Sequence, residues 1–201
     1  MRWRCGCVLR SAKYILSYLH LRNSNLTLTN MSNRPLAPKG GNDRVYTPPE
    51  LAKQIVKHFN PSGMMLDPCR GKGAFYDAML PYATNGFVEW HEIDSGTDFL
   101  NQSWQEPVCW TITNPPWSKL RSFLQKSMEV SDNVVFLCLV NAFFMKARMR
   151  DMEKEGFGMK EILFVPTPPK PWPQTGFALG AVHIQRGYTG DVKFDYSLLK
   201  A

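Results

Sequence analysis

Apolar residues along this chain fall into two patterns that predict different elements. Short apolar runs bounded by Gly, Pro, Asn or Asp are typical of buried strands, whereas apolar residues three or four positions apart predict helices with one buried face. Leu51, Ile55 and Phe59 form such a helical stripe. It follows a start signal at Thr47-Pro48-Pro49-Glu50, with Thr47 as the expected cap, and ends before Pro61. Strands are predicted at 64–66, 87–93, 108–113, 134–140, 162–165 and 179–185, and further helices at 74–80, 119–130 and 144–154.

The alternation of predicted helices and strands is the pattern of an α/β fold. The run 134–140 is apolar at nearly every position, which is typical of a parallel strand covered by helices on both faces. We therefore expect a single doubly wound sheet of the Rossmann-like kind. With 201 residues and 44% hydrophobic content, the chain can bury one full core, and no apolar stretch is long enough to cross a membrane.

The first 42 residues differ from the rest, because they contain basic side chains and no acid. Two interpretations stay open: a targeting peptide, or an over-extended start with Met31 as the initiator. We expect 1–42 to be a disordered extension and linker, and 43–201 to be the single folded domain. The five cysteines show no metal-ligand spacing, so we expect no metal site. Cys69, Cys109 and Cys138 lie in apolar or glycine-rich surroundings, as expected of reduced intracellular thiols.

Charge is divided along the chain. The net charge of +7 comes from the extension, because the 17 Lys and Arg residues outside it, of 24 in total, balance the 17 Asp and Glu residues. Within the domain, 43–118 is acidic overall and 119–150 is basic. This division suits a cationic ligand on one side and a polyanion on the other, although an ordinary mixed surface explains it equally well.

The most informative motif is Asn114-Pro115-Pro116-Trp117, which follows the predicted strand at 108–113. The Asn side-chain oxygen and a carbonyl of the rigid Pro-Pro step can both accept hydrogen bonds from one NH2 group, and proline supplies no competing donor. The Trp ring offers a flat face for stacking. The motif favours a site that grips a planar group with an exocyclic amine, although a proline-rich loop after a strand has the same composition.

A glycine-rich turn lies between a predicted strand and a predicted helix, with Gly71 and Gly73 preceded by Asp67. Such glycines let the backbone approach a ligand closely. The Lys-Ser/Thr pair of a phosphate-binding loop is missing, and the acid suits a ligand with a cationic amino-acid end, such as S-adenosylmethionine. Glu92, about twenty residues after the glycines, can take both ribose hydroxyls of such a ligand. Asp98 can accept a hydrogen bond from its adenine amino group.

In this order the motifs resemble the class I S-adenosylmethionine-dependent methyltransferases, specifically the DNA adenine enzymes of the phage and restriction-modification type. The resemblance covers residues 45–187. It implies a mostly parallel sheet with an antiparallel C-terminal strand, S-adenosylmethionine as cofactor, and DNA as partner in the cytoplasm of a bacterial or phage-infected cell. The target adenine would be flipped out of the duplex. Asn114 and the Pro115 carbonyl would then orient its amino group toward the methyl donor without a covalent intermediate.

The resemblance also assigns roles to individual residues. The catalytic group is Asn114, Pro115, Pro116 and Trp117. The cofactor-binding group is Tyr46, Thr47, Pro48, Asp67, Pro68, Gly71, Gly73, Phe75, Glu92, Ile93, Asp98 and Phe99. Substrate-binding candidates are Trp117, Lys119, Phe144, Lys170 and Trp172, with Phe144 or Trp172 as a second wall for the flipped base.

Two departures from the family pattern affect the interpretation. Only five residues separate Glu92 from Asp98, too few for the helix that usually joins the second and third strands. We also expect no separate target-recognition domain, so loops, a homodimer partner or an accessory protein would supply recognition. The best loop is the proline-rich segment 166–177, which carries Lys170 and Trp172.

Three alternatives stay open. Structured RNA could supply the adenine, because the motif around Asn114 reads a base edge and not the sugar. A protein glutamine methyltransferase would grip a side-chain carboxamide in the same way, but such enzymes usually carry Tyr at the position of Trp117. A non-catalytic binding module predicts the loss of a cofactor or catalytic motif residue, and none is lost.

Overall fold

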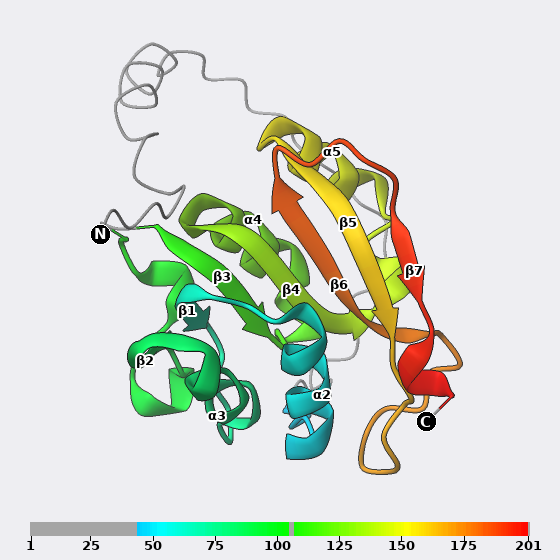
Figure 1. The fold of residues 1–201 in the computed structure, drawn as a ribbon, viewed down its shortest axis with the longest axis horizontal. Helices are drawn as coiled ribbons and strands as arrows, with labels where there is room; N and C mark the ends of the chain where they lie inside the picture. Colours follow the sequence, from blue (N-terminus) through cyan, green and yellow to red (C-terminus); the bar gives the residue numbers. More distant parts are fainter. Residues whose placement is uncertain (1–43, 105–106, 201) are drawn as a thin grey trace, which may run out of the picture. The chain divides into compact units, whose positions relative to one another are not determined.

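A computed structural model describes residues 44–104 and 107–200, and the expectation of a disordered extension at 1–42 lies outside them. The strands are β1 Gly63–Asp67, β2 Ala83–Trp90, β3 Val108–Thr113, β4 Ser131–Leu139, β5 Phe157–Phe164, β6 Leu179–Arg186 and β7 Lys193–Asp195. They form one sheet in the order β2-β1-β3-β4-β6-β5-β7 (Figure 1). All neighbouring pairs are parallel except those of β6, which is antiparallel to both β4 and β5.

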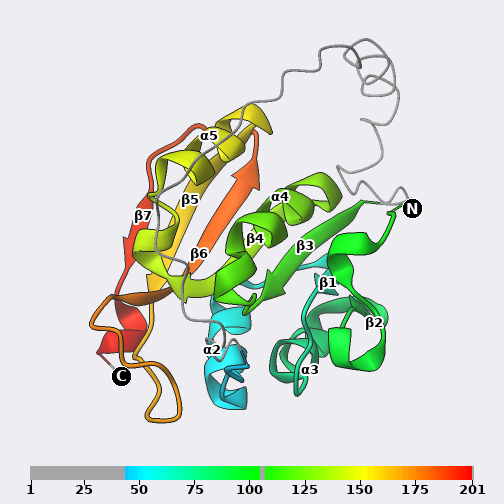
Figure 2. The same cartoon turned by 180° about the vertical axis from the view of Figure 1, so that it is seen from behind.

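Helices cover both faces of this sheet. Helices α2 (Pro49–Phe59) and α3 (Ala74–Met79) lie on one face, in front of the sheet in Figure 1. Helices α4 (Leu120–Val130) and α5 (Lys146–Lys154) lie on the other face, in front of the sheet in Figure 2. None of the described helices has the length and apolar character needed to cross a bilayer. The doubly wound α/β sheet predicted from the sequence is confirmed.

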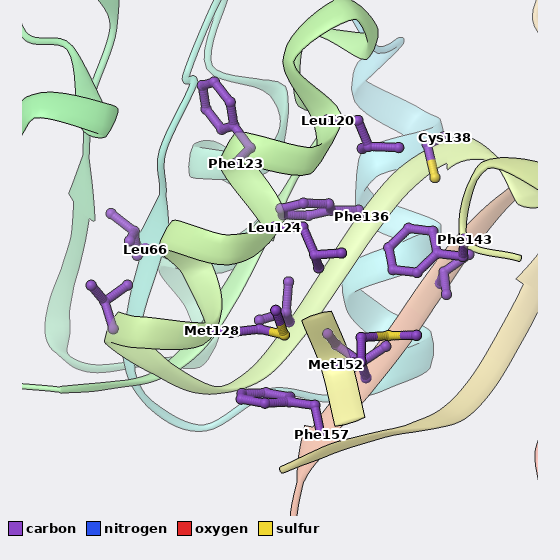
Figure 3. Packing of buried hydrophobic residues seen from close by; sticks show 14 of the residues in the cluster. Leu66, Leu120, Phe123, Leu124, Met128, Phe136, Cys138, Phe143, Met152 and Phe157 are labelled. Atoms are coloured by element: carbon purple, nitrogen blue, oxygen red, sulfur yellow. The ribbon is translucent and has the colours of Figure 1, made fainter. Parts of the chain in front are cut away.

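The apolar cluster under α4 and α5 fixes the strands that lead to the candidate site. Figure 3 shows Leu124 and Met128 of α4 beside Phe136 of β4, with Met152 and Phe157 completing the contact. None of these five side chains is more than 6% exposed. Because α4 connects β3 to β4, its burial against the sheet also fixes the segment 114–119 that precedes it.

The carboxyl ends of β1, β2 and β3 meet at one edge of the sheet. From β1 the chain continues through α3 to β2 on one side, whereas β3 continues through α4 to β4 on the other. A crevice at such a change of direction is the usual ligand site of an open α/β sheet. Asp67 ends β1 and Asn114 follows β3, so the glycine-rich turn and the Asn-Pro-Pro-Trp motif come together there.

Several details correct the sequence interpretation. Thr47 does not cap α2: Pro48 is the cap residue, with an extended ψ of 135° and no side-chain hydrogen bond, because a residue before proline is kept out of the helical region. The second strand ends at Trp90 instead of 93. The antiparallel strand β6 lies between β4 and β5, and the sequence did not predict the C-terminal strand β7.

The short connection between the second and third strands agrees with the sequence. Between Glu92 and Asp98 the chain forms only a short 3-10 turn, Ile93–Ser95, as the spacing predicted.

Candidate active site

A cavity of about 260 Å³ lies at the carboxyl ends of β1, β2 and β3. It is close to the lower end of the range for small-molecule sites, about 300 Å³. The predicted site residues that line it are Tyr46, Pro68, Gly71, Glu92, Ile93, Asp98, Phe99, Asn114, Pro116 and Lys119. Residues from both predicted motifs therefore share one cavity.

The glycine-rich loop after β1 requires glycine at two positions. Gly71 and Gly73 have φ of +53° and +89°, in the left-handed region that favours glycine. A β-carbon on Gly71 would also lie 3.1 Å from the ring of Tyr46, so only glycine allows Tyr46 to lie this close. The Gly71 amide donates a hydrogen bond of 2.6 Å to Glu92 Oε2, which joins the loop to the end of β2.

Arg70 braces the same loop. Its guanidinium carbon lies 4.3 Å from the centre of the Tyr76 ring in α3 and 4.6 Å from that of the Trp90 ring in β2. Cation–π contacts of this kind favour the arginine over either ring. The sequence interpretation assigned no role to Arg70, because the two rings come from separate elements and leave no local motif.

Asp67 is buried beneath the loop, with 1% of its surface exposed. Its Oδ1 accepts hydrogen bonds from the Thr113 hydroxyl at 2.7 Å and from the Cys69 amide at 3.4 Å. Burial raises the pKa of Asp67 to about 7, although these hydrogen bonds act in the opposite direction. The sequence predicted an acid that faces a cationic ligand, but the carboxylate joins β1 to β3 and is not among the groups lining the cavity.

Glu92 and Asp98 do line the cavity. The second carboxylate oxygen of Glu92 accepts from the Asp94 amide at 3.2 Å, and Asp98 accepts from the Leu100 amide at 3.0 Å. Backbone donors therefore hold both carboxylates in place. Three carboxylates on this side, including that of Asp94, suit ligands that present hydroxyls, amines or positive charge.

Asn114 is held from two sides. Its Nδ2 donates a hydrogen bond of 2.9 Å to the Val45 carbonyl. The Cys69 thiol donates to the Asn114 backbone carbonyl at 3.3 Å and lies 3.0 Å from the Thr113 hydroxyl. Because only the NH2 group can donate to a carbonyl, the orientation of the amide is fixed, and no group of the described residues donates to its oxygen. Val45, Cys69 and Thr113 were not predicted, since a backbone carbonyl and small neutral side chains carry no motif signal.

The remaining motif residues lie against the core. Pro115 is buried and Trp117 is half-buried. The Trp117 ring makes an edge contact with Trp172, with ring centres 6.1 Å apart and planes at 70°. Trp172 is only 3% exposed and belongs to an apolar cluster, so it supports Trp117 and does not form an open wall in this structure.

Other predicted residues lie outside the cavity lining. Gly73 caps the start of α3, and Thr47 and Phe75 are buried. Phe144 and Lys170 are exposed, in the segments that follow β4 and β5. The cavity lining therefore holds seven of the twelve cofactor candidates together with Asn114, Pro116 and Lys119. It does not include Pro48, Pro115, Trp117, Phe144 or Lys170.

The sequence matches no protein-family model and no curated protein, whereas many solved structures share its fold. A Listeria monocytogenes protein assigned to the class I S-adenosylmethionine-dependent methyltransferases superposes with a TM-score of 0.58 at 10% identity, over 76% of this chain and 65% of its own. The 23S rRNA methyltransferase ErmE superposes with a TM-score of 0.56 at 16% identity, over 72% of this chain and 72% of its own. The type I restriction-modification methyltransferase subunit of Streptococcus thermophilus superposes with a TM-score of 0.53 at 14% identity, over 74% of this chain and 46% of its own.

These likenesses show the fold. The chain has the Rossmann-like fold of class I methyltransferases, with a mostly parallel sheet and helices on both faces. It spans less than two thirds of the Listeria protein and less than half of the Streptococcus subunit.

The raised pKa of Asp67 predicts a pH dependence of stability. Between about pH 4 and pH 7 the folded protein keeps a proton that the unfolded chain has lost, so the free energy of unfolding should fall as pH rises through this window. Asp67→Asn cannot ionise and should remove this dependence. Urea unfolding at pH 5 and pH 8 should show that the wild type loses about 2–3 kcal/mol more than the variant.

Buried His183 does not disturb this comparison. Burial lowers the pKa of His183 to about 4, so this residue raises the free energy of unfolding as pH rises from 4 to 6.5. The effect is the same in the wild type and in Asp67→Asn, so it cancels in the difference between them. An identical pH dependence of wild type and variant would show that Asp67 is ionised in the folded protein throughout this range.

Proposed function

We propose that this chain is an S-adenosylmethionine-dependent methyltransferase that methylates the exocyclic amino group of adenine in DNA. The observation that carries the proposal is the Asn114 carboxamide, whose NH2 group is engaged by Val45 and whose oxygen accepts no hydrogen bond from the described residues. An amide oxygen next to the Pro115 carbonyl suits an NH2 group as substrate, because each hydrogen of one amine can meet one acceptor.

The cavity residues fit S-adenosylmethionine by their chemistry. Glu92 would accept from the ribose hydroxyls and Asp98 from the adenine amino group, and Ile93 and Phe99 would flank the ring. The acids also match the positive charges of the sulfonium and the amino-acid end. When bound, this cofactor supplies an electrophilic methyl group. Gly71 would let the loop approach the cofactor closely.

The chain's own residues would orient the amine of the substrate. Asn114 and the Pro115 carbonyl would accept its two hydrogens, which favours a pyramidal nitrogen with an available lone pair. Trp117, which is half-buried, would offer its ring to the base. Positioning and charge stabilisation of this kind need no nucleophilic side chain. Cys69 is the only thiol among the described residues that line the cavity. Burial raises its thiol pKa well above the usual range, so it stays protonated as a donor to Asn114.

DNA is proposed as the source of adenine on two grounds. The glycine-rich turn and the Asn-Pro-Pro-Trp motif resemble those of DNA enzymes, and one structural neighbour belongs to a type I restriction-modification system. Another neighbour is a 23S rRNA methyltransferase, so adenine in RNA is the second candidate. Target recognition would come from loops, a second copy or an accessory protein.

Transfer of labelled methyl groups tests the proposal. Wild-type protein should label DNA in preference to RNA or protein extract. Asn114→Ala should lose at least about 100-fold in transfer rate, because the loss of one positioned polar group in an active site has effects of this size. Gln125→Ala, which removes an exposed carboxamide from α4, should transfer methyl groups at the wild-type rate.

Binding of S-adenosylmethionine to Asn114→Ala, measured by calorimetry, should stay close to the wild-type value, which separates catalysis from cofactor binding. Label found only in protein would refute the nucleic-acid assignment. Unchanged turnover of Asn114→Ala would refute the role of this residue.

The steric requirement at Gly71 predicts a defect in cofactor binding. Gly71→Ala places a methyl group against the Tyr46 ring and strains a left-handed residue, so S-adenosylmethionine should bind about tenfold more weakly or worse by calorimetry. The matched control is Gly187→Ala, which has a similar φ of +71° but nothing within 4 Å of the new methyl group. Equal loss of binding in both variants would show general destabilisation and not a contact with Tyr46.

A further inference from the structure

Three aromatic rings are stacked at the ends of β5 and β7. Tyr196 lies parallel to Phe164, with ring centres 4.6 Å apart and planes 7° apart. Phe194 stacks on Phe164 at 6.3 Å and 25°. Tyr196 is 48% and Phe194 51% exposed, so the stack presents open aromatic surface to solvent. These three residues are called the C-terminal aromatic stack below, and the candidate active site does not account for them.

The C-terminal aromatic stack lies at the same edge of the sheet as the candidate active site. Strands β5 and β7 run in the same direction as β3, so their carboxyl ends share one edge with Asn114. In the strand order β7 is four positions from β3, which corresponds to about 20 Å across the sheet. Figure 1 shows the C-terminal turn (red) and the loop after β5 (orange) at this same end.

The segments at this end of the sheet are positively charged. The segment after β4 (140–146), the loop before β6 (165–178) and the C-terminal turn (196–200) contain Lys146, Lys170 and Lys200 and no acid. All three lysines are exposed, and within the described part of the chain none of them pairs with a carboxylate. Phe144 and Phe177 add exposed rings to the same segments.

Asp195, the acid closest in sequence to the C-terminal aromatic stack, lies on the opposite face of the sheet. Phe194 is aligned with Ile162, which belongs to the cluster under α4 and α5, whereas Asp195 is aligned with Leu163 in the cluster under α2 and α3. Lys193 pairs with Asp195 at 3.0 Å. This carboxylate is therefore neutralised and turned away from the C-terminal aromatic stack.

We propose that the C-terminal aromatic stack binds an unpaired base of a polynucleotide strand, with Lys146, Lys170 and Lys200 neutralising the phosphates of that strand. Every nucleobase can stack on an aromatic side chain, and cations along the path bind the backbone, so rings and lysines together fit this ligand. A base inside a duplex is covered on both faces by its neighbours, which makes an unpaired strand the form that fits.

One part of this proposal rests on the proposed function: the bound strand continues to the target base near Asn114. The binding platform itself is defined by its own residues. Binding measured without a methyl donor therefore tests it separately from catalysis.

Fluorescence anisotropy with a labelled single-stranded DNA of about 12 nucleotides, within the site sizes of known single-strand grooves, is the direct experiment. Tyr196→Leu keeps an apolar side chain over Phe164 but removes the flat ring, and should bind about tenfold more weakly, as expected for the loss of one stacked base. Tyr196→Phe should bind like the wild type. Phe87→Ala removes a 60% exposed ring from β2, at the other end of the strand order, and should have no effect.

The full chain is used throughout, so the basic N-terminal residues contribute equally to every variant, and thermal melts check that the Tyr196 variants are folded. A blunt duplex of the same sequence should bind more weakly than the single strand, and a matching RNA strand distinguishes the two sources of unpaired bases. Wild-type affinity of Tyr196→Leu, or a duplex bound as tightly as the single strand, would overturn the proposal. Absent methyl transfer with binding that still depends on Tyr196 would contradict the proposed function alone.

Discussion

The hydrogen bond from the Asn114 carboxamide to the Val45 carbonyl is the constraint on which the candidate site depends. It determines which end of the amide faces the cavity, and it ties the segment before α2 to the end of β3. The same segment places Tyr46 against Gly71 and pairs Arg44 with Asp94 at 3.0 Å. An exposed ion pair contributes little. The segment is also held by the Asn114 hydrogen bond, the Tyr46 contact and the packing of Val45 against an apolar cluster.

Beneath this segment, a buried chain of polar groups joins the two motifs. Asp67 accepts from Thr113, and the thiol of Cys69 lies between Thr113 and the backbone of Asn114. These hydrogen bonds connect the glycine-rich loop to the Asn-Pro-Pro-Trp motif. Along this edge of the sheet, the cavity lining contains three carboxylates beside Arg44 and Lys119, whereas Lys146, Lys170 and Lys200 and several exposed rings lie in the segments after β4, β5 and β7.

The parts predicted from sequence are those decided by local chemistry. Strand β3 was predicted to the residue, because its apolar run ends at an Asn-Pro step that cannot continue a strand. Parts decided by tertiary contacts cannot be predicted from local sequence. Trp172, predicted as an aromatic wall, is buried in this structure, and the carboxylate of Asp67, predicted to contact the ligand, is buried and accepts from Thr113 and the Cys69 amide. Strand β7 has three residues and forms only because β5, distant in sequence, offers it a partner.

A crystal structure of the protein with S-adenosylhomocysteine, the demethylated form of the proposed cofactor, tests the candidate site most directly. The ligand should lie in the cavity between Gly71 and Asn114, with its ribose at Glu92 and its adenine at Asp98. Asn114 should keep its NH2 group on the Val45 carbonyl and its oxygen toward the open side of the ligand sulfur. A ligand bound elsewhere, or an Asn114 whose NH2 group points into the cavity, would refute the proposed roles of the cavity and of Asn114.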